Sequence, residues 1–173
     1  AVLIKDPEAH FATFEMHGPY LELQERGMIA GKFLADYGLE LSRGFRALKI
    51  WMAFKEQGAA KFGRLIAQDI DLARYMAVQV EAHPLLELVA PVDLNIVCFR
   101  HIAADEDAAK ALNTEIMLRI QERGLAVPSD TTVQGKHALR CAFNNHRTQP
   151  ADIDGFLGDV LRVAEEIQSE QPA

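Results

Sequence analysis

The chain has 173 residues, a length that suits one domain or one domain with a small appendage. Apolar residues make up 49% of it, which is too large a share for an intrinsically disordered protein. No apolar run reaches the roughly 18–20 residues that would cross a bilayer, and the formal net charge of −7 provides no basic face for nucleic acid phosphates. We therefore expect a globular protein whose partner is neither a membrane nor a nucleic acid.

The first forty residues carry weak patterns. The apolar run Ala1–Ile4 predicts a short strand, and Glu8–Phe14 predicts one or two helical turns. Glycines and a proline interrupt the stretch His17–Leu41, which predicts a long loop. Loops of this length in compact domains are usually functional or disordered. Tyr20 lies in this loop, and the pattern alone favours a surface tyrosine that anchors the loop.

The stretch Ser42–Gly58 predicts an amphipathic helix with one buried face. Its apolar residues recur at steps of three and four: Phe45, Leu48, Trp51, Met52 and Phe54. We expect Ser42 to cap the helix and Gly58 to end it in a left-handed turn. Arg43 and Arg46 would then fall in the first turn, where the helix dipole disfavours cations.

From residue 59 onwards, predicted helices and strands alternate. The helices are expected at Ala59–Ala82, Asp105–Arg123 and Thr148–Ile167. The strands are expected at Leu85–Ala90, Leu94–Arg100 and His137–Asn144, and Val127–Val133 predicts either a weak strand or a turn. The nearly continuous apolar run of Leu94–Arg100 is typical of a strand that is covered on both faces. This order predicts a small sheet with helices packed on one face.

Self-contained catalytic and metal-binding motifs are absent from the sequence. It has no glycine-rich phosphate loop and no nucleophile elbow. Its six histidines show no metal-ligand spacing, so each is interpreted as a surface or packing residue, with His101 the most open of these interpretations. Cys98 and Cys141 each lie in an apolar run, which favours buried, reduced thiols in a cytosolic protein over a disulfide.

Arg140 is the residue that the strand pattern singles out. Leu139 and Cys141 share one face of the last predicted strand by its period of two. Arg140 falls on the other face, between Ala138 and Ala142. Such small neighbours leave room for a planar carboxylate to accept two parallel hydrogen bonds from the guanidinium. A solvent-facing arginine or a structural ion pair fits the same pattern, and the pattern alone does not decide between them.

Four segments stand in a recognisable order along the chain. They are GPYL at 18–21, SRGFRALKIWMAFKEQG at 42–58, LNIVCFR at 94–100 and ALRCAFNNHRT at 138–148. Together they resemble the pyridoxal-phosphate-dependent amino-acid decarboxylases, in the group of the aromatic-L-amino-acid, histidine and glutamate decarboxylases. The spacing from Tyr20 to Arg43 matches the family without a gap, and the resemblance covers essentially the whole chain.

This resemblance implies an α/β fold of the aspartate-aminotransferase-like type, fold type I. Residues 1–48 would be the end of the large domain that binds pyridoxal 5'-phosphate, including the catalytic loop. Residues 49–173 would be the small carboxyl-terminal α+β domain, with a short, antiparallel-rich sheet covered by helices. The chain is thus similar to the carboxyl-terminal third of such an enzyme.

The resemblance also implies where the cofactor is held. In the family, a lysine that follows a histidine and precedes an aromatic residue binds the cofactor covalently, and none of the seven lysines here stands in that context. We therefore expect no cofactor-binding residue and no metal site in this chain, and no activity from the chain alone.

Two site residues follow from the resemblance. Tyr20 matches the tyrosine of the mobile catalytic loop, which protonates the substrate carbon after carbon dioxide has left. That loop reaches the active site of the partner subunit, so a homodimer is implied. Arg140 matches the arginine that engages the substrate α-carboxylate. Arg43 corresponds to a family arginine without an assigned role, and Gly44 departs from the arginine that usually follows it.

Three functions are consistent with these observations. The first is a cytoplasmic lyase of amino-acid metabolism that decarboxylates an L-amino acid, by overall likeness an aromatic one, to the amine and carbon dioxide. The second keeps the fold and cofactor but is an aldehyde synthase or a transaminase. Tyr20 disfavours the synthase, because many synthases have phenylalanine at that position. The third is a non-catalytic α/β binding module, if the chain is complete as given.

Overall fold

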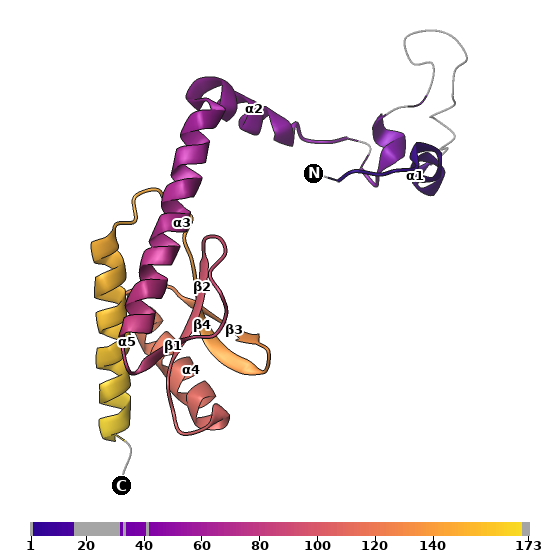
Figure 1. The fold of residues 1–173 in the computed structure, drawn as a ribbon. Coiled ribbons are helices and arrows are strands. Elements are labelled where there is room, and N and C mark those ends of the chain that lie inside the picture. Colours follow the sequence, from indigo (N-terminus) through magenta and orange to yellow (C-terminus); the bar gives the residue numbers. More distant parts are fainter. Residues whose placement is uncertain (1, 16–31, 33, 41, 171–173) are drawn as a thin grey trace. The chain divides into compact units, whose positions relative to one another are not determined.

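The computed structural model describes residues 2–15, 32, 34–40 and 42–170. The chain divides into two compact units, Ala1–Glu56 and Gln57–Ala173. Figure 1 shows the helices and strands of both units in chain order. Among the described residues, no helix is both long enough and apolar enough to pass through a membrane.

The first unit begins with the short helix α1 (Pro7–Phe14). It starts after Asp6, whose side chain accepts hydrogen bonds from two backbone N–H groups of the first turn. A single 3₁₀ turn, η1 (Leu34–Tyr37), lies against it, with the Tyr37 and Phe11 rings edge to face at 5.4 Å between centroids. The helical turns predicted before the long loop are therefore confirmed.

The strand predicted at Ala1–Ile4 is wrong for the residues that the structure describes. Val2, Leu3 and Ile4 belong to no strand and are 85%, 97% and 48% exposed. A strand is stable only when a neighbouring strand takes its backbone hydrogen bonds. No strand of the described part of the chain pairs with these residues.

Helix α2 (Arg46–Gln57) begins later than predicted. Ser42 does not cap it, and Arg43 lies before it, so only Arg46 is in the first turn. Gly44 accounts for the late start, because a glycine inside a helix costs about 1 kcal/mol relative to alanine. Gly58 ends the helix with a φ of +76°, as predicted.

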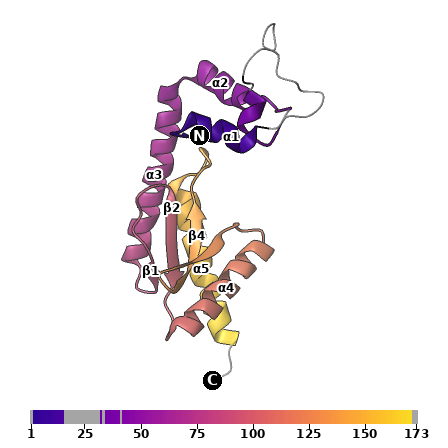
Figure 2. The same cartoon turned by 90° about the vertical axis from the view of Figure 1, so that its right-hand side faces the viewer.

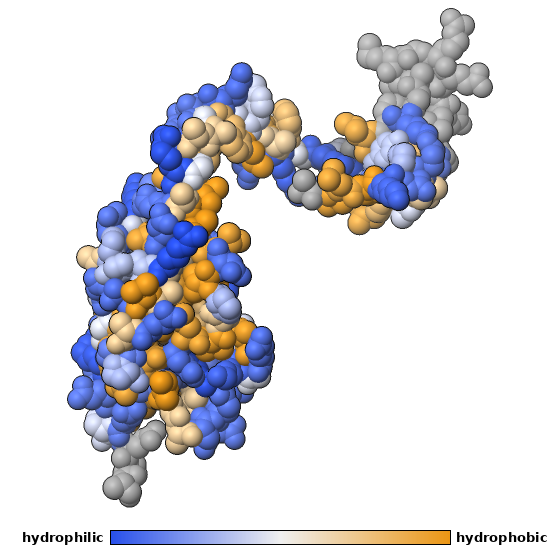
Figure 3. Space-filling view, viewed as in Figure 1, coloured by the Kyte–Doolittle hydropathy of each residue, from blue (hydrophilic) through white to orange (hydrophobic). Residues whose placement is uncertain are grey.

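The face of α2 that was predicted to be buried is exposed. None of its residues is buried, and Trp51 and Phe54 are 58% and 47% exposed. Apolar side chains therefore reach the surface along this helix (Figure 3). The prediction that Trp51 and Phe54 are core residues is wrong in this structure, since an amphipathic pattern identifies an apolar face without specifying what covers it.

The second unit contains three helices and four strands in the predicted order. The helices are α3 (Ala59–Ala82), α4 (Glu106–Glu122) and α5 (Pro150–Glu170). The strands are β1 (Leu86–Leu88), β2 (Ile96–His101), β3 (Ser129–Val133) and β4 (Lys136–Ala142). They form an antiparallel sheet in the order β1-β2-β4-β3, and the helices lie on one side of it (Figures 1 and 2).

The hydrophobic core lies between this face of the sheet and the three helices. Phe99 of β2 and Leu139 of β4 are paired neighbours and are fully buried. The largest fully buried apolar side chains of both layers are Met76, Val80, Val97, Phe99, Ile116, Ile120, Leu139, Val160 and Val163. Each such side chain contributes about 1.5–3 kcal/mol by its burial. The buried residues of α3 all lie in its second half, whereas Ile66 in its first half is 58% exposed.

A buried asparagine of α4 completes the end of β2. The Asn113 side-chain oxygen accepts from the His101 backbone N–H at 2.8 Å, and its nitrogen donates to the His101 carbonyl at 2.9 Å. The amide therefore supplies hydrogen bonds beyond the point where β4 stops pairing with β2, at Phe99, while β1 lies on the other side of His101. The His101 ring is itself buried, with Nδ1 2.8 Å from the Ile102 carbonyl oxygen. His101 is thus a packing residue.

The two cysteines are free and half-buried. Cys141 pairs with Val97 in the sheet, so Cys98 lies on the opposite face. A disulfide between them would require one strand to turn over, because their side chains leave the sheet in opposite directions.

Candidate functional site

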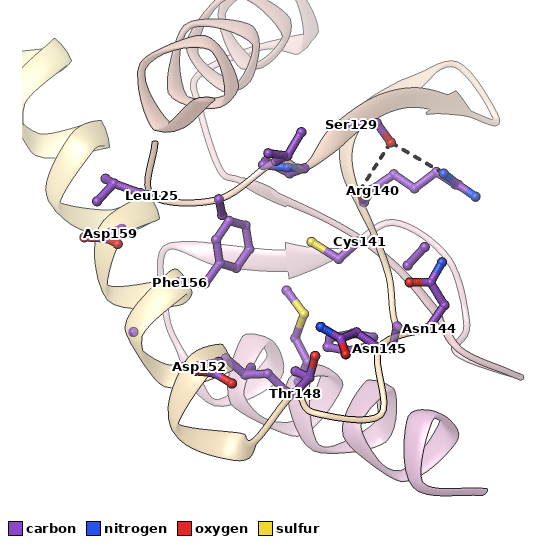
Figure 4. A pocket seen from close by; sticks show the side chains of 18 of the residues that line it. Leu125, Ser129, Arg140, Cys141, Asn144, Asn145, Thr148, Asp152, Phe156 and Asp159 are labelled. Carbon is purple, nitrogen blue, oxygen red and sulfur yellow. Dashed lines mark hydrogen bonds between the residues drawn. The ribbon is translucent and has the colours of Figure 1, made fainter. Parts of the chain in front are cut away.

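Arg140 lies in β4 on the face of the sheet opposite the helices. Its neighbour Leu139 is packed in the core, and the period of two places Arg140 on the other side. Figure 4 shows the Arg140 and Cys141 side chains leaving β4 in opposite directions. The predicted strand and the predicted face of Arg140 are both confirmed.

Four short, uncharged side chains surround Arg140 on this face. Cys98 of β2 and Ser129 of β3 are its partners in the two neighbouring strands. Ala138 and Ala142 precede and follow it on β4, the first buried and the second exposed. The sequence indicated the two alanines, whereas the cross-strand neighbours became visible only with the strand register.

Within the described part of the chain, the guanidinium of Arg140 has one partner, and this partner is neutral. Its Nη1 donates to Ser129 Oγ at 3.5 Å, and Ser129 Oγ donates to the Arg140 carbonyl oxygen at 3.4 Å (Figure 4). Both bonds are long and therefore weak. Among the described residues, no carboxylate forms an ion pair with Arg140. The structural ion pair that the sequence left open as an alternative thus finds no support in that part of the chain.

Arg100 lies on the same face of the sheet as Cys98. Unlike Arg140, it is paired with two carboxylates. Its Nε lies 2.5 Å from a Glu87 oxygen, and its Nη1 lies 2.6 Å from a Glu106 oxygen. The Arg100 side chain is only 8% exposed. Burial opposes its charge, but the bonds to Glu106 and Glu87 outweigh it and raise the pKa of Arg100. The ion-pair cluster of Arg100, Glu87 and Glu106 was not predicted. The signal that could have indicated it is the charged residue at the end of the apolar run Leu94–Arg100.

A cavity of about 850 Å³ lies on the helix side of β4. The loop before β3, the end of β4 and the first turns of α5 line it, and it is open to solvent (Figure 4). Its apolar wall includes Phe143 and Phe156 together with Cys141. Burial raises the pKa of the Cys141 thiol to about 12, so this thiol is protonated and unreactive near neutral pH.

The two carboxylates that line this cavity already have partners within the protein. The Asp152 carboxylate accepts the Gln149 backbone N–H at 2.9 Å, and Asp159 pairs with Arg162 at 2.5 Å. Arg140 contributes to the wall, but its guanidinium extends to the other side of the sheet (Figure 4). The cavity and the Arg140 guanidinium are therefore two separate features.

The residues of this chain do not fit the covalent site of a pyridoxal phosphate cofactor. A lysine that bonds to such a cofactor lies in an enclosed site, where its amine loses its proton readily. All seven lysines are exposed, and none lines the cavity. One of them, Lys32, forms an ion pair with Glu8 at 2.7 Å. The described ranges also contain no group of three side chains arranged to hold a metal ion.

Tyr20, the predicted proton donor, lies outside the described residues. The assignments of Tyr20 and Arg140 therefore stay predictions, as does the domain boundary after residue 48.

The family of the chain follows from a comparison with known proteins. Residues 1–102 match the model of the pyridoxal-dependent decarboxylase conserved domain. The chain belongs to the pyridoxal-dependent decarboxylase family. The predicted family is thus confirmed, and with it the cofactor class of that family.

Individual relatives agree with this assignment. The chain is 32% identical over 174 residues to an aromatic-L-amino-acid decarboxylase of Bacillus atrophaeus, covering 99% of this chain and 36% of the relative. It is 31% identical over 160 residues to a 3,4-dihydroxyphenylacetaldehyde synthase of Aedes aegypti, covering 92% of this chain and 30% of the relative. The chain spans about a third of the length of the curated relatives that it matches.

The fold agrees as well. A crystal structure of Oryza sativa TDC with PLP and tryptamine superposes with a TM-score of 0.72 at 28% identity, covering 78% of this chain and 29% of that chain. The predicted fold class, an α/β enzyme of fold type I with a helix-covered antiparallel sheet, is confirmed.

Proposed function

We propose that this chain is part of a pyridoxal-phosphate-dependent lyase that converts an L-amino acid to its amine and carbon dioxide. Membership of the decarboxylase family supports this proposal. The observation in the structure that carries it is Arg140, a guanidinium without a carboxylate partner among the described residues and with short, neutral neighbours. When bound, pyridoxal phosphate supplies the electron-accepting group that this chemistry needs.

Arg140 binds the α-carboxylate of the substrate in this proposal. A guanidinium presents two parallel N–H groups to a carboxylate, which fixes both its position and its plane. Decarboxylation needs the breaking carbon–carbon bond to be held in one orientation, and a fixed carboxylate plane restricts that bond. Arg140 therefore orients the group that leaves.

Tyr20 delivers the proton that replaces the carboxylate. The carbon that loses carbon dioxide must gain a proton before the amine can leave, and a positioned phenol can supply it. The support for Tyr20 is its place in the family motif at 18–21. We extend the proposal to a cytoplasmic homodimer, in which Tyr20 serves the active site of the other subunit, on the same resemblance.

The substrate class that we propose is an aromatic L-amino acid. Its support is that several relatives of this chain are named as decarboxylases of aromatic amino acids. A second candidate function is an aldehyde synthase, because the Aedes aegypti relative is named as one. Tyr20 favours the decarboxylase, since phenylalanine is frequent at this position among the synthases.

Product analysis of the complete enzyme separates these two functions. With an aromatic L-amino acid, the decarboxylase releases equal amounts of amine and carbon dioxide. The synthase also releases carbon dioxide, but it consumes oxygen and water and forms aldehyde, ammonia and hydrogen peroxide in place of the amine. We expect the wild type to form amine and the Tyr20→Phe variant to form less amine and more aldehyde. A wild type that forms mainly aldehyde would contradict the proposal, and unchanged amine formation by the variant would contradict the role of Tyr20.

A further inference from the structure

The Ser129 hydroxyl contacts Arg140 twice. It donates its single hydrogen to the Arg140 carbonyl oxygen, so its lone pairs are free to accept the Arg140 Nη1–H. The arginine side chain is thereby joined to its own backbone through one neutral group (Figure 4). Among the described residues, no acceptor is bonded to Arg140 Nε or Nη2. That edge of the guanidinium has two parallel N–H groups and remains available for a carboxylate.

The β3–β4 turn explains why Ser129, and not its neighbour Asp130, lies opposite Arg140. The turn consists of Gln134 and Gly135, whose φ angles of +50° and +83° are those of a two-residue hairpin turn of type I′. This turn sets the register in which Ser129 opposes Arg140. A shift by one residue would bring the carboxylate of Asp130 onto the arginine's face. In the observed register, Asp130 opposes Leu139 and lies on the other face.

We propose that Ser129 is a positioning residue for Arg140, which restricts the guanidinium without neutralising it. The inference rests on the proposed role of Arg140 as the carboxylate anchor. A hydroxyl suits this task because it limits the rotation of the long side chain and leaves the whole positive charge for the ligand. A carboxylate at the same position would restrict the side chain equally but would compete with the substrate.

The test uses the complete enzyme with Ser129→Ala, Ser129→Thr and Ser129→Asp. We expect S129A to raise KM for the amino acid about threefold to tenfold with little change in kcat, because one weak hydrogen bond to the anchor is lost. S129T keeps the hydroxyl and should resemble the wild type. S129D should weaken binding of the amino acid more than S129A does, because the new carboxylate pairs with the guanidinium. Inhibition by the product amine, which lacks the carboxylate, should be unchanged in all three.

Thr131→Ala is the matched control, since Thr131 lies two residues along β3 on the same face, opposite Ala138. It should behave as the wild type. If S129A leaves KM for the amino acid unchanged while Arg140→Ala weakens amino-acid binding, the positioning role of Ser129 is wrong and the proposed function stands. If R140A also leaves amino-acid binding unchanged, the carboxylate role of Arg140 is wrong and the inference fails with it. Equal weakening of amine and amino acid by S129A would likewise overturn the inference.

Discussion

Arg100 and Arg140 leave the same face of one sheet, but their charges have different surroundings. Arg100 is buried between Glu87 and Glu106, which bind two of its nitrogens. Arg140 is half-buried beside a serine and a cysteine, neither of which compensates its charge. The difference arises from the neighbouring elements, since β1 and α4 bring Glu87 and Glu106 to Arg100, whereas β2 and β3 bring a cysteine and a serine to Arg140. A cation on a sheet face is therefore structural or available according to the side chains that adjacent strands and helices place beside it.

The largest expected effect concerns stability. Arg100→Ala should destabilise this chain by about 1–3 kcal/mol, because it removes charged hydrogen bonds to two carboxylates that are themselves 33% and 50% exposed. Arg140→Ala, which breaks only long bonds to a serine, should change stability by about 0.5 kcal/mol or less. Urea denaturation followed by circular dichroism measures both variants. Equal losses of stability would show that the two arginines do not differ in the way described.

A smaller effect is expected at the turn that sets the register around Arg140. Gly135→Ala should destabilise the chain by about 1 kcal/mol, because φ at this position is +83° and a side chain is strained there. Open space surrounds the position, so the strain is confined to the backbone.

The control for this variant is Gly63→Ala, in the interior of α3 with open space around it. It should stabilise the chain by up to about 1 kcal/mol through helix propensity. The same denaturation experiment measures both, and a stabilising G135A would contradict the turn geometry.

The smallest effect concerns the two thiols and pH. Burial raises the pKa of Cys141 to about 12, so its thiolate is scarce below that pH. Burial also raises the pKa of Cys98, while the nearby Arg140 lowers it. Arg140→Gln should therefore raise the pKa of Cys98 further and slow its alkylation by iodoacetamide at pH 8–9. Mass spectrometry of the labelled chain measures this rate, and faster labelling of Cys98 would contradict the proximity of the arginine charge.

The raised pKa of Cys141 also predicts that the stability of the chain falls at high pH. The folded chain keeps the Cys141 proton to higher pH than the unfolded chain, whose thiol has an ordinary pKa near 9. The contribution of this thiol to stability is complete below that pH. It is lost progressively as pH rises towards 12.

Periodicity predicted much of the second unit. Apolar spacing located α3, α4 and α5, and alternation placed Arg140 on the face opposite Leu139, with alanines on either side. These are local properties of one segment. The family motifs added the expected role of Arg140, which no periodicity contains.

Properties that depend on distant partners were not predictable in this way. Ser129 and Cys98 became neighbours of Arg140 only through strand pairing, which a local pattern does not specify. The same reason explains the corrections in the first unit. An apolar stripe on α2 and an apolar run at Ala1–Ile4 each need a partner element, and their own sequences do not supply it.

The central claim, that Arg140 binds the substrate carboxylate, is tested most directly by comparing two ligands of the complete enzyme. Arg140→Ala should weaken binding of the aromatic L-amino acid roughly 10- to 100-fold, as expected for the loss of a charged hydrogen-bonded pair. Binding of the corresponding amine, which has no carboxylate, should be unchanged. Arg64→Ala, an exposed arginine on α3, serves as the control and should alter neither. If R140A binds both ligands as tightly as the wild type does, or if it binds both more weakly by the same factor, Arg140 is not the carboxylate anchor.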